Sequence, residues 1–184
     1  HEWLTELIHQ NAEAARWAGV DLRLRSCKYW VRTDPVLLAT MVQNVLSNCF
    51  KYGAHRPVLI GVRRRGAGLA IVIYDRGNGI AEEHLPKVFE EFYRVRQVRD
   101  KDVEGVGLGL SIIKRLGQLI GVSVALRSRL GRGTAVTLYG LPIAAPPPST
   151  VNRDEVRQVG LLTGLKVCLV EDDRNVLLAT SALL

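Results

Sequence analysis

The chain has 184 residues, of which 25 are Lys or Arg, 18 are Asp or Glu and 47% are hydrophobic. This length and apolar content predict one domain with a full core and room for part of a second, and they exclude a disordered chain. No stretch approaches the roughly 18 consecutive apolar residues of a membrane helix, and no signal-peptide pattern opens the chain. We therefore expect a cytoplasmic fragment without membrane contact.

The cysteines and the charge distribution narrow the class of protein. Cys27, Cys49 and Cys168 are widely spaced and form no CxxC pair, so we expect a reducing compartment and neither a disulfide scaffold nor a zinc site. Residues 1–150 hold 21 basic and 13 acidic side chains. Such an excess suits any polyanion, including a nucleotide triphosphate. The arginines form short groups without interleaved aromatics, so we expect no nucleic-acid binding.

Taken in order, the predicted elements alternate between helices and strands. Apolar spacing predicts a helix over residues 1–18, and alternation predicts a strand over 20–26. Asp34 can cap a second helix, with Pro35 in its first turn, because apolar pairs then recur every four residues. The other expected elements are strands 58–64 and 69–75, helices 82–91 and 108–120, the latter ended by Gly121, and strands 122–128 and 134–139. This order predicts an α/β sandwich with helices on one face of a mostly antiparallel sheet.

Two composition changes divide the chain. We assign residues 1–143 to the first domain and residues 144–164, which begin with a Pro-rich stretch, to a linker. Residues 165–184 begin with an apolar strand that ends in acidic residues, but they are too few for an independent core. We therefore expect them to be the truncated start of a second domain.

On the second helix, Asn44, Asn48 and Lys51 are spaced to share one face beside the apolar arc. A solvated helix edge is the favoured interpretation of this stripe alone. The alternative is a magnesium–phosphate site, in which Asn48 offers its carbonyl oxygen to the metal and Lys51 neutralises phosphate charge.

Two glycine-rich stretches carry further candidates. In DRGNGI, Asp75 ends an apolar strand and is followed by Gly77 and Gly79. This is either a simple turn or a site where the carboxylate accepts a hydrogen bond from an exocyclic amine such as that of adenine. The stretch GVGLGL, over residues 105–110, enters a helix and is either a hinge or a phosphate-binding helix N-terminus. No GxxxxGK[ST] motif is present, and no GxGxxG stretch opens a βαβ unit.

In their order and spacing, NVLSNCFKYG, DRGNGI, FEEFYR, GVGLGLSIIKR and GRGT resemble the ATP-binding catalytic domain of sensor histidine kinases. That domain belongs to the GHKL ATPase superfamily, which includes gyrase, MutL and the ninety-kilodalton heat-shock chaperone. The resemblance covers residues 34–141. It implies the Bergerat fold, a two-layer sandwich of three helices on one face of a mixed five-stranded sheet, with ATP and Mg²⁺ as ligands.

The resemblance also implies roles for single residues. Asn48 would hold Mg²⁺, Asn44 and Lys51 would face the phosphates as catalytic residues, and Asp75 would select adenine. The segment 94–104 would form a lid over the nucleotide. The remaining implied contacts are Tyr52, Gly77, Gly79, Ile80, Tyr93, Gly105, Val106, Gly107, Leu108, Gly109, Leu110 and Thr134. Tyr93 also belongs, with Phe89 and Phe92, to the aromatic motif of the family.

One position departs from the family pattern. Many histidine kinases have Gln or Glu one turn before the first Asn of the stripe, whereas this chain has Thr40. A hydroxyl is a poor proton acceptor, so we expect positioning and electrostatics to supply most of the rate.

The tail resembles a different family. LKVCLVEDD resembles the first strand and acidic pair of a response-regulator receiver domain, which implies that Asp172 and Asp173 help to bind Mg²⁺. Together the parts resemble a fragment of a hybrid histidine kinase. None of the four histidines has the sequence context of a phosphoacceptor, so we expect the acceptor to lie on an upstream dimerisation domain.

The expected function is therefore transfer of the ATP γ-phosphoryl group to that histidine in two-component signalling. The expected partners are the dimerisation domain and a receiver domain, either in cis or on a separate response regulator. The alternatives are a conformational ATPase or a serine-phosphorylating relative of the same superfamily, and a docking module that binds nucleotide without transferring phosphate.

Overall fold

The computed structural model of the chain describes residues 2–25, 29–53, 55–95 and 106–146. Most of the predicted lid lies outside the described residues, and so does Gly105. So do the predicted linker from residue 147 onward and the receiver-like segment at 165–184.

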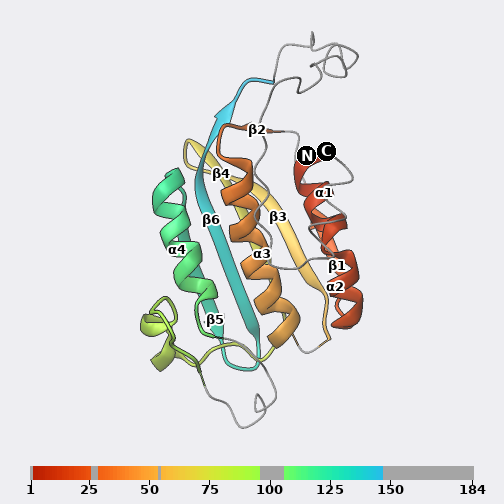
Figure 1. Cartoon of the computed structure of the whole chain (residues 1–184), viewed down its shortest axis with the longest axis vertical. Coiled ribbons are helices and arrows are strands. Elements are labelled where there is room, and N and C mark those ends of the chain that lie inside the picture. The colour runs from red at the N-terminus through yellow and green to blue at the C-terminus, as the bar shows by residue number, and fades with distance from the viewer. Residues whose placement is uncertain (1, 26–28, 54, 96–105, 147–184) are drawn as a thin grey trace, which may run out of the picture. The chain divides into compact units, whose positions relative to one another are not determined.

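Six strands form the sheet (Figure 1). They are β1 (Leu22–Arg25), β2 (Trp30–Val31), β3 (Val58–Arg65), β4 (Gly68–Tyr74), β5 (Ser123–Arg129) and β6 (Gly133–Ala144). The order is β1-β3-β4-β6-β2, and β5 also pairs with β6. The sheet is mixed, because β1 runs parallel to β3 whereas the other pairs are antiparallel. The sixth strand, β2, has two residues, which are too few to show an alternating pattern in the sequence.

The helices lie on one face of the sheet (Figure 1). They are α1 (Glu2–Gln10), α2 (Ala12–Trp17), α3 (Pro35–Tyr52) and α4 (Gly109–Ile120), with a 3₁₀ helix, η1 (Glu82–Lys87). The predicted α/β sandwich with helices on one face is confirmed. Among the described residues, no helix has the length and apolar content that crossing a membrane requires.

Two predicted helices differ from the structure for local reasons. The single helix predicted over residues 1–18 is divided between α1 and α2 at Asn11, whose side-chain Nδ2 donates to the carbonyl oxygen of Leu7 at 2.8 Å. Such local side-chain bonds compete with helix continuation. The helix predicted over 82–91 is the shorter η1, which contains Pro86. Proline lacks the backbone N–H that an α-helix needs there.

The ends of α3 and α4 form as the sequence predicts. Asp34 Oδ1 accepts hydrogen bonds from the backbone N–H groups of Val36 and Leu37, each at 2.9 Å, and Pro35 occupies the first helical turn. Gly121 ends α4 in the left-handed conformation, at φ +69°. The helix start at Asp34 and the helix end at Gly121 each depend only on residues that are adjacent in the sequence.

The core lies between the helices and the covered face of the sheet. Met41 and Leu46 of α3 are fully buried against Ile60 of β3 and Leu138 of β6. Burial alternates along the strands, so that Leu59 is 41% exposed on the opposite face. The helices of the described ranges therefore leave the second face of the sheet uncovered.

Candidate nucleotide site

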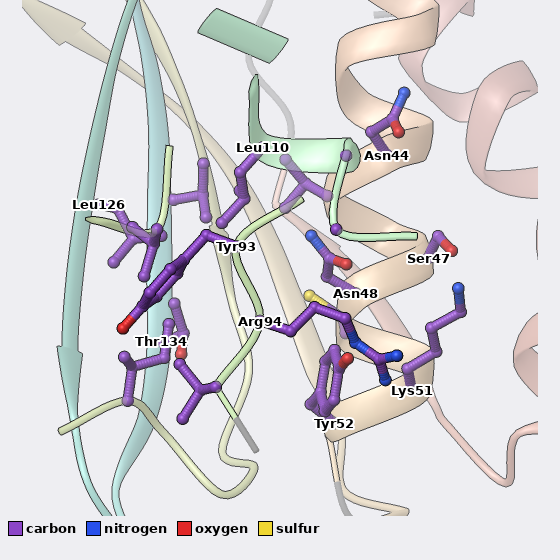
Figure 2. Close-up of a pocket in the computed structure, with 18 of the residues that line it drawn as sticks. Asn44, Ser47, Asn48, Lys51, Tyr52, Tyr93, Arg94, Leu110, Leu126 and Thr134 are labelled. Carbon is purple, nitrogen blue, oxygen red and sulfur yellow. The ribbon is translucent and has the colours of Figure 1, made fainter. Parts of the chain in front are cut away.

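A cavity of about 370 Å³ opens between α3, the end of β4 and the start of α4 (Figure 2). The predicted site residues that line it are Asn44, Asn48, Lys51, Tyr52, Asp75, Gly79, Ile80, Tyr93, Val106, Gly107, Leu108, Gly109, Leu110 and Thr134. Gly77 is not among the lining residues, and Gly105 lies outside the described residues. Motifs that are far apart in the sequence therefore line the same cavity.

The polar stripe of α3 faces this cavity instead of open solvent. Asn44 and Asn48 are half-buried, and Lys51 is exposed at the rim. Figure 2 shows Asn48 directed toward the cavity and Asn44 near the start of α4, whereas the Lys51 side chain extends outward at the edge of α3. Asn44 Nδ2 donates to the carbonyl oxygen of Thr40 at 2.9 Å, so its Oδ1 is the atom free to accept from a ligand.

Gly109, the first residue of α4, lies close to both amides. A Cβ atom at this position would lie 3.4 Å from Asn44 Oδ1 and 3.7 Å from Asn48 Nδ2. Any side chain there would fill the space between the stripe and the helix N-terminus. Glycine keeps that space free, with the first N–H groups of α4 beside it.

Asp75 is buried where the cavity meets the end of β4, with 7% of its surface exposed. Its Oδ1 accepts hydrogen bonds from the backbone N–H of Gly77 at 2.8 Å and of Thr134 at 3.3 Å. Its Oδ2 lies 3.8 Å from Cys49 Sγ. The two oxygens are therefore unequal, because Oδ1 is occupied by the backbone whereas Oδ2 has only a long thiol contact among the described residues.

Burial controls the ionisation of this pair. Desolvation raises the pKa of Asp75 above its ordinary value, and the hydrogen bonds from Gly77, Thr134 and Cys49 offset part of that rise. Desolvation together with the neighbouring carboxylate raises the pKa of the Cys49 thiol well above its ordinary value. Cys49 therefore stays protonated and acts as the donor to Asp75.

Gly77 shapes the cavity from behind it. A side chain on Gly77 would collide with the carbonyl oxygen of Tyr52 at the end of α3, and the same oxygen accepts a hydrogen bond from the N–H of Asn78 at 3.1 Å. Gly79 has φ +68°, and a side chain there would collide with the carbonyl oxygen of Arg129. Both glycines thus permit close backbone packing around Asp75.

Ser128 of β5 is a site residue that the sequence did not reveal. Its Oγ accepts from the N–H of Ile80 at 2.8 Å, donates to the carbonyl oxygen of Gly133 at 2.9 Å and lies 2.8 Å from Thr134 Oγ1. It thereby links the DRGNGI loop to β6. Ser128 itself is not among the lining residues. The lining residues that were not predicted are Val45, Ser47, Cys49, Asn78, Val88, Ile112, Leu126 and Val136, whereas Arg94 and Val95 belong to the predicted lid. Strand alternation could have placed Leu126 and Ser128 on the face of Thr134, once the pairing of β5 with β6 was known.

Two residues that flank the predicted lid, Phe92 and Gly107, lie close together. The N–H of Phe92 donates to the carbonyl oxygen of Gly107 at 3.1 Å. Gly107 has φ +79°, and a Cβ there would lie 2.9 Å from the backbone of Phe92. Nearby, the Tyr93 hydroxyl lies 2.7 Å from His84 Nδ1. The segment before residue 96 is thus joined to the start of α4.

The predicted departure at Thr40 has a structural counterpart. Its hydroxyl donates to the carbonyl oxygen of Val36 at 3.0 Å, one turn earlier on α3. The side chain is therefore engaged with its own helix, and nothing about its contacts suits a proton acceptor.

Comparisons with known proteins agree with this geometry. The chain is 35% identical over 131 residues to the sensor-like histidine kinase SenX3 of Mycolicibacterium smegmatis, which covers 71% of the chain and 34% of that protein. It is 35% identical over 108 residues to the sensor histidine kinase YkoH of Bacillus subtilis, covering 59% of the chain and 24% of that protein. The chain therefore spans about a quarter to a third of the length of these relatives.

Solved structures show the same fold. The mycobacterial sensor histidine kinase MprB superposes with a TM-score of 0.63 at 27% identity, over 76% of this chain and 94% of that one. Full-length ShkA in complex with AMPPNP superposes with a TM-score of 0.67 at 22% identity, over 80% of this chain and 31% of that one. The model of the histidine kinase-, DNA gyrase B- and HSP90-like ATPases matches residues 33–145, which include every described element of the cavity. The chain belongs to this ATPase family.

Proposed function

We propose that the cavity binds ATP with Mg²⁺ and that, within a longer protein, this domain transfers the γ-phosphoryl group to a histidine of a dimerisation domain. One observation carries the proposal. A buried carboxylate, Asp75, and a polar stripe, Asn44 and Asn48, line one cavity that is large enough for a nucleotide. Membership of the ATPase family and the similarity to sensor histidine kinases support it.

The different contacts of the two Asp75 carboxylate oxygens indicate where adenine would bind. Oδ2 is the oxygen with room to accept the exocyclic amine of adenine, since Oδ1 is held by two backbone N–H groups. Guanine has a carbonyl at the corresponding ring position and would place an acceptor against a carboxylate. The apolar walls of the cavity, including Leu126 and Val136, suit the faces of a purine ring.

The phosphate end combines a helix N-terminus with a cation. The N-terminus of α4, which begins at Gly109, lies beside the Asn stripe, and the positive end of the helix dipole favours phosphate there. Lys51, exposed at the rim, would neutralise a terminal phosphate. Asn44 Oδ1 and Nδ2 differ in availability, because Nδ2 already donates to Thr40.

Asn48 fits a role as the protein ligand of Mg²⁺. Among the described residues, no group of three or more His, Cys, Asp or Glu side chains could hold a metal ion. Mg²⁺ accepts oxygen ligands and commonly takes few from the protein when phosphate oxygens supply others, and the Asn48 amide supplies one such oxygen at the cavity wall. When bound, the ion would neutralise charge that develops on the transferring phosphoryl group.

The other polar residues of the cavity would act by binding and orienting the phosphates. Thr40 is engaged with Val36 and does not serve as a base. Phosphoryl transfer requires little covalent chemistry from the protein. The second N–H of Asn44 Nδ2, the Lys51 ammonium and the α4 N–H groups would therefore stabilise negative charge in a fixed geometry.

The test separates binding from transfer. Calorimetric titration with ADP and AMPPNP, with and without Mg²⁺, should show binding that Asp75→Asn greatly weakens and the matched control Asp21→Asn does not. Asp21 is exposed just before β1, away from the cavity. Incubation with labelled ATP and a supplied dimerisation domain should then give acid-labile, base-stable phosphohistidine. Equal affinity in Asp75→Asn and the native chain would contradict the adenine contact.

One observation favours a second candidate function. Because the Thr40 hydroxyl is bonded within α3, the domain could bind nucleotide as a docking module without transfer. That alternative predicts full nucleotide affinity with no labelled phosphohistidine in a single-turnover assay.

We further propose that the longer protein is a hybrid kinase whose receiver domain begins near residue 165, after the linker predicted over 144–164, of which Ala144 is the last residue of β6. The sequence LKVCLVEDD supports this, although it lies outside the described residues. A response-regulator receiver domain, in cis or on a separate protein, would then accept phosphate from the histidine. Sequencing the protein beyond Leu184 tests the proposal, because a receiver domain requires a phosphorylatable aspartate after a later strand.

A further inference from the structure

The sheet face opposite the helices carries arginines at alternating strand positions. Strand residues that alternate with the buried ones point to this second face, which the helices leave uncovered (Figure 1). Six exposed arginines occupy it: Arg23, Arg25, Arg63, Arg65, Arg127 and Arg129. Among the described strand residues of this face none is acidic. Just before β1, Asp21 pairs with Arg23 at 2.8 Å.

The other exposed acidic side chains of the described ranges lie elsewhere. They belong to α1 and α2, to the cap of α3, to η1 and to the segment that follows η1. The two faces of the domain thus have different charge. A surface with one sign of charge attracts partners of the opposite sign and orients them as they approach.

A row of short side chains crosses the arginine face. The register pairs Gly61 with Val72, Val72 with Thr137, and Thr137 with Ala125. We call these four residues the short row. Arg25 is the partner of Gly61 on β1 and ends the row. The row runs across the strands, so a partner lying along it would contact four strands at once.

The neighbouring rows on both sides of the short row carry longer side chains at most of their strands, and we call them its borders. One border runs from Arg23 through Leu59, Tyr74 and Ala135 to Arg127. The other runs from Arg63 through Ala70 and Tyr139 to Ser123, and the guanidinium of Arg65 from the next row lies 3.8 Å from the Tyr139 ring centroid. The borders are four residues apart along β3, which is about 13 Å at ~3.3 Å per residue. An α-helix with its side chains is about 10–12 Å wide and fits this separation.

Gly61 is the second observation that indicates a partner. A Cβ atom on Gly61 would have no heavy atom within 4 Å, so nothing inside the described domain requires glycine there. Glycine in the middle of a strand weakens the strand and often marks a place where another chain or a ligand approaches closely. Since the space above Gly61 is open, the approach must come from outside the domain.

We propose that the arginine face binds an acidic amphipathic helix of a partner protein, which lies along the short row with its carboxylates beside the arginines of both borders. The proposal does not depend on nucleotide binding. A second copy of this face would be repelled by its own charge. Nucleic acid is disfavoured because the Tyr139 ring is already covered by Arg65 and offers no free platform for a base. A membrane is disfavoured because Leu59 is the one exposed large apolar residue among the described residues of β1, β3, β4, β5 and β6, with Trp30 of the two-residue β2 the other exposed one in the sheet.

The probe is a labelled helical peptide whose apolar stripe is flanked by Glu on both sides. The four strand spacings from β1 to β5 measure about 19 Å, which about 13 helical residues span. Fluorescence anisotropy with the full chain should show saturable binding that weakens as salt rises. The same peptide with Gln for Glu, single-stranded DNA and vesicles of anionic lipid should bind more weakly. Tighter binding of the DNA or the vesicles than of the acidic peptide would overturn the proposal.

Two matched pairs of variants locate the binding. Gly61→Trp should weaken the peptide on the order of ten-fold by filling the short row, whereas Gly61→Ala should stay within about two-fold. Arg63→Gln with Arg127→Gln should weaken it by about 2- to 25-fold, since each exposed ion pair contributes a factor of about 1.4 to 5. The control, Arg16→Gln with Lys114→Gln, makes the same charge change on the helix layer.

Melting followed by circular dichroism confirms that each variant is folded. Equal losses in both charge variants would show that the peptide responds to net charge alone. Undiminished binding in folded Gly61→Trp would show that the helix does not occupy the short row. Either result overturns the proposal, as does the absence of saturable binding to the native chain.

Discussion

Replacing Cys49 with alanine should weaken adenine-nucleotide binding through Asp75 and without any contact to the nucleotide. Cys49 Sγ lies 3.8 Å from Asp75 Oδ2, the oxygen that the backbone leaves free for the adenine amine. A hydrogen bond contributes about 0.5–1.5 kcal/mol net, and a long S–H contact belongs near the lower end of that range. We therefore expect a loss of about 0.5–1 kcal/mol, or about two- to five-fold in Kd.

The pH dependence separates this mechanism from a loss of packing. The carboxylate of Asp75 must be charged to accept the amine strongly, so affinity is lost as pH falls through its pKa in the folded protein. Desolvation raises that pKa and the bond from Cys49 lowers it. In Cys49→Ala the pKa should therefore rise further, and the loss of affinity should begin at a higher pH than in the native chain.

Calorimetric titration with ADP between about pH 5 and pH 8 measures both effects. Cys49→Ser retains a donor and should restore the native affinity and pH profile. In an Asp75→Asn background, Cys49→Ala should have no further effect, because the two side chains act as one unit. If Cys49→Ala binds ADP with the native affinity and an unshifted pH profile, the thiol does not orient the carboxylate and the reasoning is wrong.

Three further changes test how the cavity is held. Asp75→Asn should raise the melting temperature of the nucleotide-free chain at neutral pH. Because the pKa of Asp75 is higher in the folded state than in the unfolded state, the gain in stability should be complete at pH values above the folded-state pKa. It should disappear at pH values below the unfolded-state pKa. Melting temperatures of both proteins at several pH values measure this dependence. Gly77→Ala should destabilise the fold by about 1–3 kcal/mol in denaturant unfolding because its Cβ meets backbone, whereas Gly61→Ala, which meets nothing, should not. Ser128→Ala should lower ADP affinity by about two- to ten-fold through loss of one hydrogen bond to the DRGNGI loop, and the exposed control Ser123→Ala on the same strand should leave it unchanged.

Local signals made much of the fold predictable. Asp34 and Pro35 mark the start of α3, and Gly121 marks the end of α4, because capping depends on residues within one turn. The division at Asn11 and the two-residue β2 were not predicted. In each case the outcome depends on one side-chain bond or on pairing with a distant strand, which hydrophobic periodicity does not report.

Only the site residues that belong to a sequence motif were predictable. The α3 stripe alone favours a solvated edge, and only the approach of Gly109 and of the DRGNGI loop places it on a cavity wall. Ser128 belongs to no motif, and its role arises because β5 pairs with β6 beside Thr134. Such residues contribute to the site because the fold brings them close to it. They cannot be identified from the sequence until the pairing of the strands is known.

Asp75 shows why the two kinds of prediction differ. Its burial works against folding, since desolvation opposes the charged carboxylate and the bonds from Gly77, Thr134 and Cys49 compensate only in part. A residue chosen for stability alone at this strand end would be apolar, like the buried Ile73 that precedes it on the same face of β4. The glycines around it also reduce backbone stability in order to allow close packing. The buried carboxylate and the glycines both lower the stability of this strand end, so a ligand explains them better than the fold does. Asp75→Asn should make the chain more stable and abolish nucleotide binding, and these two changes together measure the conflict between stability and binding.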